Sequence, residues 1–262
     1  MPEKVVVFVP VFNEEKTVGK VLSDLVKLKQ ARIVHEIVVV NDGSTDDSKK
    51  IIEEFPGIHV INLRRNIGKG FAFYAGAKKA QTMGATKLVM LDSDLEKVDE
   101  MQMQILLKPL EKVEIKMSVA RLSFLINSTP LSGQLINHNF LSGQRAIKMS
   151  ALTPLLEMRR DVWLEFIAGI SKSGKGPKVI DRSGYGFEVA LNHLIAGDKF
   201  LIHSRNTEIC TPHFHEHSSK PNGDKFLLME EINSTIEKIR NRTMKLNRLK
   251  DQKKRQPQKR PK

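Results

Sequence analysis

Short apolar runs alternate with longer amphipathic segments over the first 92 residues of this 262-residue chain. The apolar runs are rich in β-branched residues, which predicts strands over residues 4–9, 36–40, 59–63 and 88–91. Between them, apolar residues recur at helical spacing, which predicts helices over residues 17–28, 46–54 and 70–83. Such strands, alternating with helices, form parallel sheets covered on both faces. The pattern therefore predicts an α/β fold of the doubly wound, Rossmann-like class.

The pattern is less regular in the second part of the chain. Residues 96–117 have a helical pattern with a break expected at Pro109, whereas residues 118–180 show no clear periodicity. A helix is predicted over residues 185–196, a strand over 200–208 and a final helix over 226–249. These elements are compatible with one large α/β domain that continues beyond the first four strands.

Each of the four predicted strands is followed by a cluster of polar and turn-forming residues. The clusters cover residues 10–15, 41–46, 64–70 and 92–94. Ligands of open parallel sheets bind beyond the carboxyl ends of the strands. One such cluster alone is typical of an ordinary turn or helix cap, and Ser44 or Asp46 would suit a cap. Four clusters on one rim favour a ligand site.

The fourth cluster, Asp92-Ser93-Asp94, follows the apolar run 88–91. Two carboxylates at positions i and i+2 lie on one side of an extended segment, so both could face one ion. Oxygen ligands at the end of a buried strand suit Mg²⁺ or Mn²⁺ bound to a diphosphate. The same pattern occurs often in solvated turns, so its meaning depends on the other clusters.

The remaining clusters offer groups that suit a nucleotide. Asp42 and Glu14 could accept hydrogen bonds from a base or a ribose, and Phe12 could stack on a base or pack in the core. Lys69 lies between two glycines, where the backbone allows a diphosphate to approach. The chain has neither the G-x-G-x-x-G pattern of dinucleotide-binding folds nor a P-loop pattern.

Composition and cysteine content limit the class of protein. Hydrophobic residues make up 40% and charged residues 28% of the chain, as in soluble globular proteins. The longest clean apolar stretch, residues 5–12, has 8 residues, far below the roughly 20 that span a bilayer. The N-terminus lacks the pattern of a secretory signal peptide, and the single cysteine, Cys210, excludes an internal disulfide framework. We therefore expect a cytoplasmic protein.

The net charge of +13 is concentrated at the C-terminal end. Residues 238–262 contain 12 Lys and Arg and one acid, whereas residues 1–237 are almost neutral. Such a tail can be merely flexible and solubilising, or it can bind anionic lipid headgroups at the inner face of a membrane, with about 1 kcal/mol per cation. RNA could be attracted by charge alone, although no aromatic residues interleave the cations for base stacking.

The four rim motifs resemble those of the GT-A glycosyltransferases of family 2, over residues 9–14, 40–46, 66–70 and 91–94. Among that family they are similar to polyprenyl- and dolichyl-phosphate sugar transferases and to glucosyl-3-phosphoglycerate synthases. The resemblance implies a GT-A, mostly parallel sheet flanked by helices. It also implies that Asp92 and Asp94 hold Mg²⁺ or Mn²⁺. The residues that would bind a UDP- or GDP-sugar donor at the rim are Pro10, Phe12, Glu14, Asp42, Lys69 and Ser93.

The resemblance is looser in the second half. Residues 141–146 resemble the segment before the acceptor site, and residues 184–188 resemble a Gly-Tyr-Gly-x-Glu stretch whose acid faces the sugar and the acceptor. Glu188 and Arg145 are therefore the candidate catalytic residues, although an acid at a helix start is also favoured by the helix dipole. The Glu-Asp pair of many inverting members is absent. Inversion and retention at the anomeric carbon both remain open.

A histidine is expected to complete the metal site. His213, His215 and His217 share one face if their segment is extended. The resemblance to phosphoglycerate-linked enzymes favours His215 or His213 as the third ligand, and we take His215 as the candidate. The alternative is that these histidines are surface or phosphate-contacting loop residues.

These observations together predict one glycosyltransferase domain over residues 1–237, with a nucleotide-binding half (1–94), an acceptor half (95–237) and a flexible basic tail (238–262). The expected reaction is the metal-dependent transfer of a sugar from a nucleotide sugar to a polyprenyl phosphate or a small phosphorylated acceptor such as phosphoglycerate. The alternative is a non-catalytic nucleotide-binding family member that its tail recruits to membrane or RNA. A homodimer is also compatible with the sequence.

Overall fold

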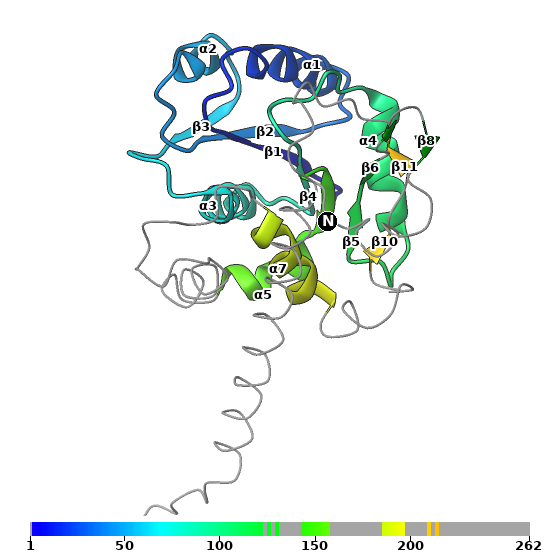
Figure 1. The fold of residues 1–262 in the computed structure, drawn as a ribbon. Coiled ribbons are helices and arrows are strands. Elements are labelled where there is room, and N and C mark those ends of the chain that lie inside the picture. Colours follow the sequence, from blue (N-terminus) through cyan, green and yellow to red (C-terminus); the bar gives the residue numbers. More distant parts are fainter. Residues whose placement is uncertain are drawn as a thin grey trace, which may run out of the picture.

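The computed structural model describes residues 2–122, 125–126, 129–130, 143–157, 185–196, 209–210 and 213–214. Within these ranges a seven-stranded sheet has the order β10-β5-β9-β4-β1-β2-β3 (Figure 1). Its strands are β1 (Val5–Val11), β2 (Glu36–Asn41), β3 (His59–Asn62), β4 (Lys87–Met90), β5 (Met117–Val119), β9 (Arg145–Lys148) and β10 (Ile209–Cys210). Strands β4, β1, β2 and β3 pair in parallel, and β9 is antiparallel to both β4 and β5.

Helices cover both faces of this sheet, as the sequence pattern predicts. One side carries α1 (Val18–Gln30), α2 (Ser48–Glu53), α4 (Glu100–Leu107) and the short 3₁₀ helix η1 (Lys108–Glu111). The other side carries α3 (Lys69–Thr82), α5 (Met149–Leu156) and α7 (Tyr185–Ala196) (Figure 1). In β1, Val5, Val7 and Val9 join the first core, whereas Val6 and Phe8 join the second. This period of two divides the apolar side chains of one strand between two cores.

Aromatic packing ties α7 to the first half of the fold. The rings of Phe8 and Phe73 meet edge to face at 6.0 Å, and Phe73 lies 5.0 Å from the ring of Phe187 in α7. A Cβ at Gly76 would collide with the ring of Phe8, so only glycine lets α3 approach β1 this closely. This packing holds the first turn of α7 beside the first turn of α3.

The predicted elements of residues 4–91 are confirmed, with bounds within a few residues of the observed ones, and α7 has the predicted bounds. The break expected at Pro109 within the helical pattern 96–117 is confirmed, because α4 gives way to η1 at Lys108, but its C-terminal end is wrong, because residues 117–119 form β5, which pairs with β9. Pro109 cannot donate a backbone hydrogen bond, which favours the change to a short 3₁₀ turn. The predicted strand 200–208, the helix 226–249 and the basic tail lie outside the described residues.

Two further pairings are short. Strand β11 (His213–Phe214) runs parallel to β6 (Arg121–Leu122), and β7 (Leu125–Ile126) is antiparallel to β8 (Thr129–Pro130). The pairing of β11 with β6 brings residues 213–214 beside residues 121–122, which are far apart in the sequence.

Candidate active site

The loops that follow β1 and β2 are joined into one rim by hydrogen bonds. The amide of Asn13 donates to Ser44 Oγ at 3.1 Å, and the amide of Thr45 donates to Asn13 Oδ1 at 2.8 Å. The amide of Glu14 donates to Ser48 Oγ at 2.8 Å. Asn13 has a φ of 55°, a conformation that asparagine tolerates better than most residues. Hydrogen bonds therefore hold the two loops together at the carboxyl ends of the neighbouring strands β1 and β2.

Asp46 lies beside the start of α2, whose N-cap residue is Asp47, so the interpretation of Asp46 itself as the cap is wrong by one residue. Its Oδ1 accepts a hydrogen bond from the amide of Ser48 at 3.0 Å, in the first turn of α2, and its Oδ2 accepts one from the amide of Glu15. Burial acts to raise the pKa of Asp46, but these hydrogen bonds outweigh it and lower that pKa. From the position before the N-cap residue, Asp46 thus joins the first turn of α2 to the first loop.

Asp42 links the loop after β2 to the loop before α3. Its two carboxylate oxygens accept hydrogen bonds from the amides of Ile67 and Gly68, each at 2.8 Å. Burial raises the pKa of Asp42, and the two amides offset part of that effect. Gly43 has a φ of +71°, and a Cβ there would collide with the backbone of Arg65. The close approach of these loops therefore requires both the carboxylate and the glycine.

The other predicted nucleoside contacts lie on the same rim. Pro10 is half-buried near the end of β1, and the side chain of Phe12 is 43% exposed directly after the strand. Thr17 Oγ1 donates to the carboxylate of Glu14 at 3.0 Å. The exposure of Phe12 argues against the core role that the sequence left open for this ring. Binding of a nucleoside by these residues stays a prediction.

Lys69 is the centre of an ionic cluster at this rim. Its Nζ lies 2.7 Å from Asp92 Oδ1 and 2.7 Å from Glu188 Oε1. Lys69 begins α3, Asp92 follows β4, and Glu188 is in the first turn of α7. The cluster joins residues from both halves of the chain that the sequence singled out separately.

The charges in this cluster stabilise one another. Burial disfavours the ammonium of Lys69, but the neighbouring carboxylates of Asp92 and Glu188 outweigh it and raise the pKa of Lys69. Burial also acts to raise the pKa of Asp92, yet the ion pair with Lys69 and the hydrogen bond from Gln144 hold that pKa below its usual value. Both side chains of the pair therefore remain charged at neutral pH.

The residues that directly precede β9 also contact Asp92. Gln144 Nε2 donates to Asp92 Oδ2 at 3.0 Å, and the carboxylate packs directly on Gly143. A Cβ at Gly143 would collide with all three carboxyl atoms of Asp92. The carboxylate position therefore depends on an amide donor and on a residue without a side chain.

Arg145 lies behind the cluster rather than at its surface. Its side chain is fully buried, and its Nη1 donates to Asn192 Oδ1 at 3.0 Å. Its Nη2 lies 3.8 Å from Glu188 Oε2, an oxygen that has no hydrogen-bond partner among the described residues. Burial lowers the pKa of Arg145, while Glu188 and Asp92 counteract that effect. Arg145 thus contributes positive charge beneath Glu188.

Binding of a metal by Asp92, Asp94 and His215 stays a prediction. Strand β4 ends at Met90, and Ser93 and Asp94 lie in a turn, so the extended pairing expected for Asp92 and Asp94 is wrong. Ser93 is buried and Asp94 is half-buried. Within the described part of the chain, no three His, Cys, Asp or Glu residues form a group that could hold a metal. His215 lies outside the described residues.

Three residues of this site are not among the predicted site residues, although two of them lie in the segment 141–146 that resembles the family's. Gly143 and Gln144 precede Arg145 directly, and Asn192 follows Glu188 by four positions in α7. Four residues is one helical turn, so Asn192 shares a helix face with the predicted acid. That spacing was a usable signal for Asn192, whereas the contacts of Gly143 and Gln144 with Asp92 depend on the pairing of β9 with β4.

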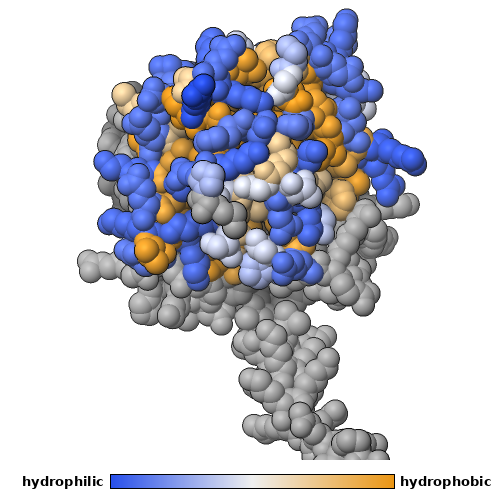
Figure 2. All heavy atoms as spheres, turned by 180° about the vertical axis from the view of Figure 1, so that it is seen from behind, coloured by the Kyte–Doolittle hydropathy of each residue, from blue (hydrophilic) through white to orange (hydrophobic). Residues whose placement is uncertain are grey.

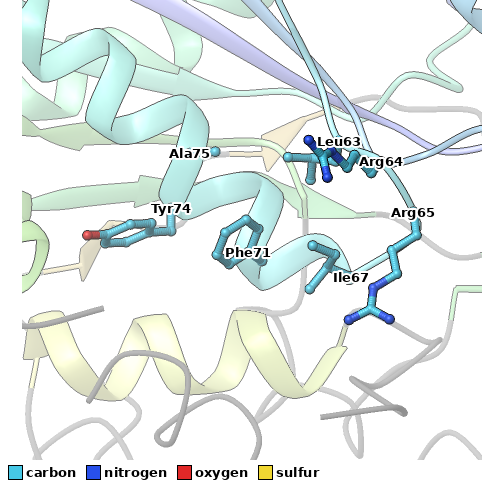
Figure 3. Close-up of a pocket in the computed structure, with 7 residues that line it drawn as sticks. All are labelled: Leu63, Arg64, Arg65, Ile67, Phe71, Tyr74 and Ala75. Carbon is cyan, nitrogen blue, oxygen red and sulfur yellow. The ribbon is translucent and has the colours of Figure 1, made fainter. Parts of the chain in front are cut away.

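A groove of about 690 Å³ lies beside the rim, along the first turns of α3 (Figure 3). Figure 3 shows Phe71 and Tyr74 on the same side of α3, with Ile67 and Arg65 towards the start of the helix. Its lining is mainly apolar with two arginines, namely Leu63, Arg64, Arg65, Ile67, Phe71, Tyr74 and Ala75. The groove adjoins the rim through Ile67, whose amide donates to Asp42.

The described part of the chain contains no helix that is long and apolar enough to cross a membrane. Viewed from behind, its surface mixes hydrophilic residues with smaller hydrophobic areas (Figure 2). The tail that could contact a membrane lies outside the described residues, so that contact stays a prediction.

Several relatives share the first part of the sequence. An undecaprenyl-phosphate 4-deoxy-4-formamido-L-arabinose transferase of Proteus mirabilis is 38% identical over 103 residues, which cover 37% of this chain and 31% of that protein. A dolichyl-phosphate β-glucosyltransferase of Trichomonas vaginalis is 34% identical over 105 residues, or 36% of this chain and 32% of that protein. The chain thus matches about a third of the length of each of these curated relatives.

The fold is shared over a longer stretch. Glucosyl-3-phosphoglycerate synthase from Mycobacterium tuberculosis, solved in complex with Mn²⁺ and UDP-glucose, matches 92% of this chain and 79% of its own with a TM-score of 0.58. The sequence identity is 18%, so this likeness establishes the GT-A fold alone. The model of glycosyl transferase family 2 matches residues 6–145, which is more than half of the chain. The chain therefore belongs to glycosyl transferase family 2.

Proposed function

We propose that this protein transfers a sugar from a nucleotide-sugar donor to a phosphorylated acceptor with the help of a divalent metal. The observation that carries the proposal is the convergence of Asp92 and Glu188 on Lys69 at the rim. The cluster brings a cation and two carboxylates to the rim where ligands of such sheets bind, and Asp94 is present beside it. The intact cluster therefore favours the enzyme over a non-catalytic nucleotide-binding protein.

The donor is proposed to lie along the rim, with its nucleoside near Pro10, Phe12, Glu14 and Asp42. Phe12 is exposed enough to stack on a base, and the bonded loops give the nucleoside a rigid support. Lys69 would face the diphosphate. Ser93, which follows Asp92 directly in the sequence, would lie beside it. The complexes of the structural relative with UDP-glucose support a nucleotide sugar, and we take UDP- and GDP-sugars as the donors to test.

The carboxylates of Asp92 and Asp94 are hard oxygen ligands of the kind that Mg²⁺ and Mn²⁺ prefer, so the residues present fit such an ion. His215 is proposed as a third ligand. When bound, the ion would neutralise charge that develops on the departing nucleotide. Lys69 contributes positive charge at the same place, since it already contacts Asp92.

Glu188 is proposed to contact the transferred sugar or the acceptor. One of its oxygens is held by Lys69, and the other is buried without a hydrogen-bond donor among the described residues. A buried oxygen of this kind can accept a hydrogen bond from a ligand hydroxyl. The acceptor would enter over residues 120–190. The named relatives point to a polyprenyl phosphate, and the structural relative to phosphoglycerate.

The experiment is a transfer assay with a panel of UDP- and GDP-sugars, Mn²⁺ or Mg²⁺, and either phosphoglycerate or a short polyprenyl phosphate. We expect transfer that requires the metal and that Asp94→Ala abolishes while the fold stays intact. Undiminished transfer in Asp94→Ala would refute the metal assignment. Nucleotide binding that is unaffected by metal, without transfer or slow release of free nucleotide, would favour the non-catalytic alternative.

Residues 238–262 are proposed to hold the protein at an anionic membrane surface, where a lipid-phosphate acceptor would be located. Twelve cations with one acid favour such contact through charge. Removal of these residues is expected to lower binding to vesicles that contain phosphatidylserine, without lowering transfer to a water-soluble acceptor. Equal vesicle binding by the shortened and the full chain would contradict this role.

A further inference from the structure

Glu188 and Asn192 face the same arginine from one helix. They lie one turn apart in α7 and are both buried, with exposed fractions of 3% and 0%. Arg145 Nη1 donates to Asn192 Oδ1 at 3.0 Å, whereas Arg145 Nη2 stays 3.8 Å from Glu188 Oε2. The guanidinium is therefore bonded to the neutral amide and only near the carboxylate.

A buried arginine usually bonds to a carboxylate in preference to a neutral amide, and the arrangement here is the reverse. A guanidinium and a carboxylate in a buried site usually form short, paired hydrogen bonds of about 2.8 Å. Here the amide oxygen of Asn192 engages Arg145, and Glu188 Oε2 has no hydrogen-bond partner among the described residues. A buried acceptor left in this state within a folded protein requires an explanation.

We propose that Asn192 is a positioning residue that restrains Arg145 and so keeps Glu188 Oε2 available to a ligand hydroxyl. At 3.8 Å Arg145 Nη2 still lies near Glu188 Oε2, because Coulomb attraction between the two side chains persists beyond hydrogen-bond distance. The oxygen thereby lies near a cation but accepts no hydrogen bond among the described residues. This role rests on the proposed function, in which the hydroxyl belongs to the donor sugar or to the acceptor.

The first test is kinetic and uses Asn192→Leu, which removes the amide oxygen at similar volume. Arg145 is then expected to close onto Glu188, and kcat should fall about tenfold to a hundredfold. The affinity for UDP and Mn²⁺ should stay within about twofold of that of the unchanged protein, because the rim is untouched. Asn192→Asp keeps the oxygen that holds Arg145 and should recover most of the lost rate.

A double-mutant cycle with Glu188 distinguishes the proposed positioning role of Asn192 from a purely structural one. In a Glu188→Gln background, Asn192→Leu should cause no further loss of kcat beyond about twofold, because the oxygen that Asn192 protects is already replaced. Equal losses in both backgrounds would overturn the proposal. So would full activity of a folded Asn192→Leu variant.

The closing experiment does not depend on activity. A crystal structure of Asn192→Leu, or of Asn192→Ala if the leucine variant does not fold, should show Arg145 Nη2 within about 3 Å of Glu188 Oε2. An unmoved guanidinium would overturn the positioning role, even if the enzyme is active. The variant could show Arg145 closed onto Glu188 while the protein without the substitution transfers no sugar from any donor. That combination would refute the proposed function but would still establish that Asn192 restrains Arg145.

Discussion

Lys69 and Glu188 are 119 positions apart in the sequence, yet Lys69 Nζ lies 2.7 Å from Glu188 Oε1. The contact joins the start of α3 to the first turn of α7, and it is supported by the packing of Phe73 on Phe187. Residues from the first part and from the second part of the chain are thereby joined at one cation. This relationship gives rise to the predictions below.

Replacement of the shared cation should destabilise the protein. Lys69→Met leaves the carboxylates of Asp92 and Glu188 close together without a cation between them, and the side chains are 21%, 26% and 3% exposed. We expect a loss of about 2–4 kcal/mol in the free energy of unfolding, measured by urea denaturation at pH 7. The matched control is Lys97→Met, since Lys97 pairs with Asp99 at 2.8 Å on the exposed surface. Similar losses in both variants would contradict the central position of Lys69.

The stability of the folded protein should decrease as the pH is lowered, and part of this decrease should depend on Asp92. Its pKa is lower in the folded protein than its usual value, so the unfolded chain binds more protons as the pH falls. The stabilisation is therefore fully present above the ordinary carboxyl pKa and is lost as the pH falls through the lower folded value. Thermal unfolding of the unchanged protein and of Asp92→Asn should show a difference in Tm that narrows below about pH 4. A difference that stays constant would refute the charged state of Asp92.

A methyl group at Gly143 should disturb Asp92 more than the fold. A Cβ there collides with the Asp92 carboxylate, so Gly143→Ala should displace that carboxylate from Lys69 and Gln144. We expect Mn²⁺ and UDP to bind at least about tenfold more weakly, as measured by calorimetry. Gly57→Ala is the control, because a Cβ at Gly57 meets nothing within 4 Å and its cost is confined to the positive φ of 76°. Unchanged binding by Gly143→Ala would exclude Asp92 from the metal site.

Loss of the Asp42 carboxylate should separate the second and third loops of the rim. Asp42→Ala leaves the amides of Ile67 and Gly68 without their acceptor in a buried place. We expect a loss of about 2–4 kcal/mol in unfolding free energy, together with weaker nucleotide binding. Asp47→Ala is the matched control, because Asp47 is exposed and its side chain makes no capping hydrogen bond to α2. If the two variants were equally stable, Asp42 would have no role in joining the loops.

The parallel sheet and its rim could be predicted because their signals are local. The apolar runs of β1 to β4 alternate with helical periods, and each is followed by polar residues at the edge where ligands bind. Even α7 could be placed with the correct bounds. The turn at Ser93 and Asp94 could not, because a D-x-D pattern fits an extended segment and a turn equally well.

The partners within the site could not be predicted from local pattern. The D-x-D pattern predicts metal binding by Asp92 and Asp94, but it does not predict that Asp92 also contacts Lys69 and Gln144, as the pairing of β9 with β4 allows. The position of Arg145 behind Glu188 depends on how α7 packs on the sheet, which no periodicity specifies. Contacts between distant segments are set by tertiary packing, so the sequence indicates the participants but not their geometry.

The most direct test of the proposed function compares nucleotide release by the unchanged protein and by Glu188→Gln. Both would be given UDP- and GDP-sugars with Mn²⁺ and with each candidate acceptor, and nucleotide binding would be measured in parallel by calorimetry. We predict acceptor-dependent release that EDTA stops, and a loss of at least about a hundredfold in Glu188→Gln with nucleotide affinity retained. Release at an unchanged rate in that variant, or nucleotide binding by the unchanged protein without release from any donor, would contradict the account.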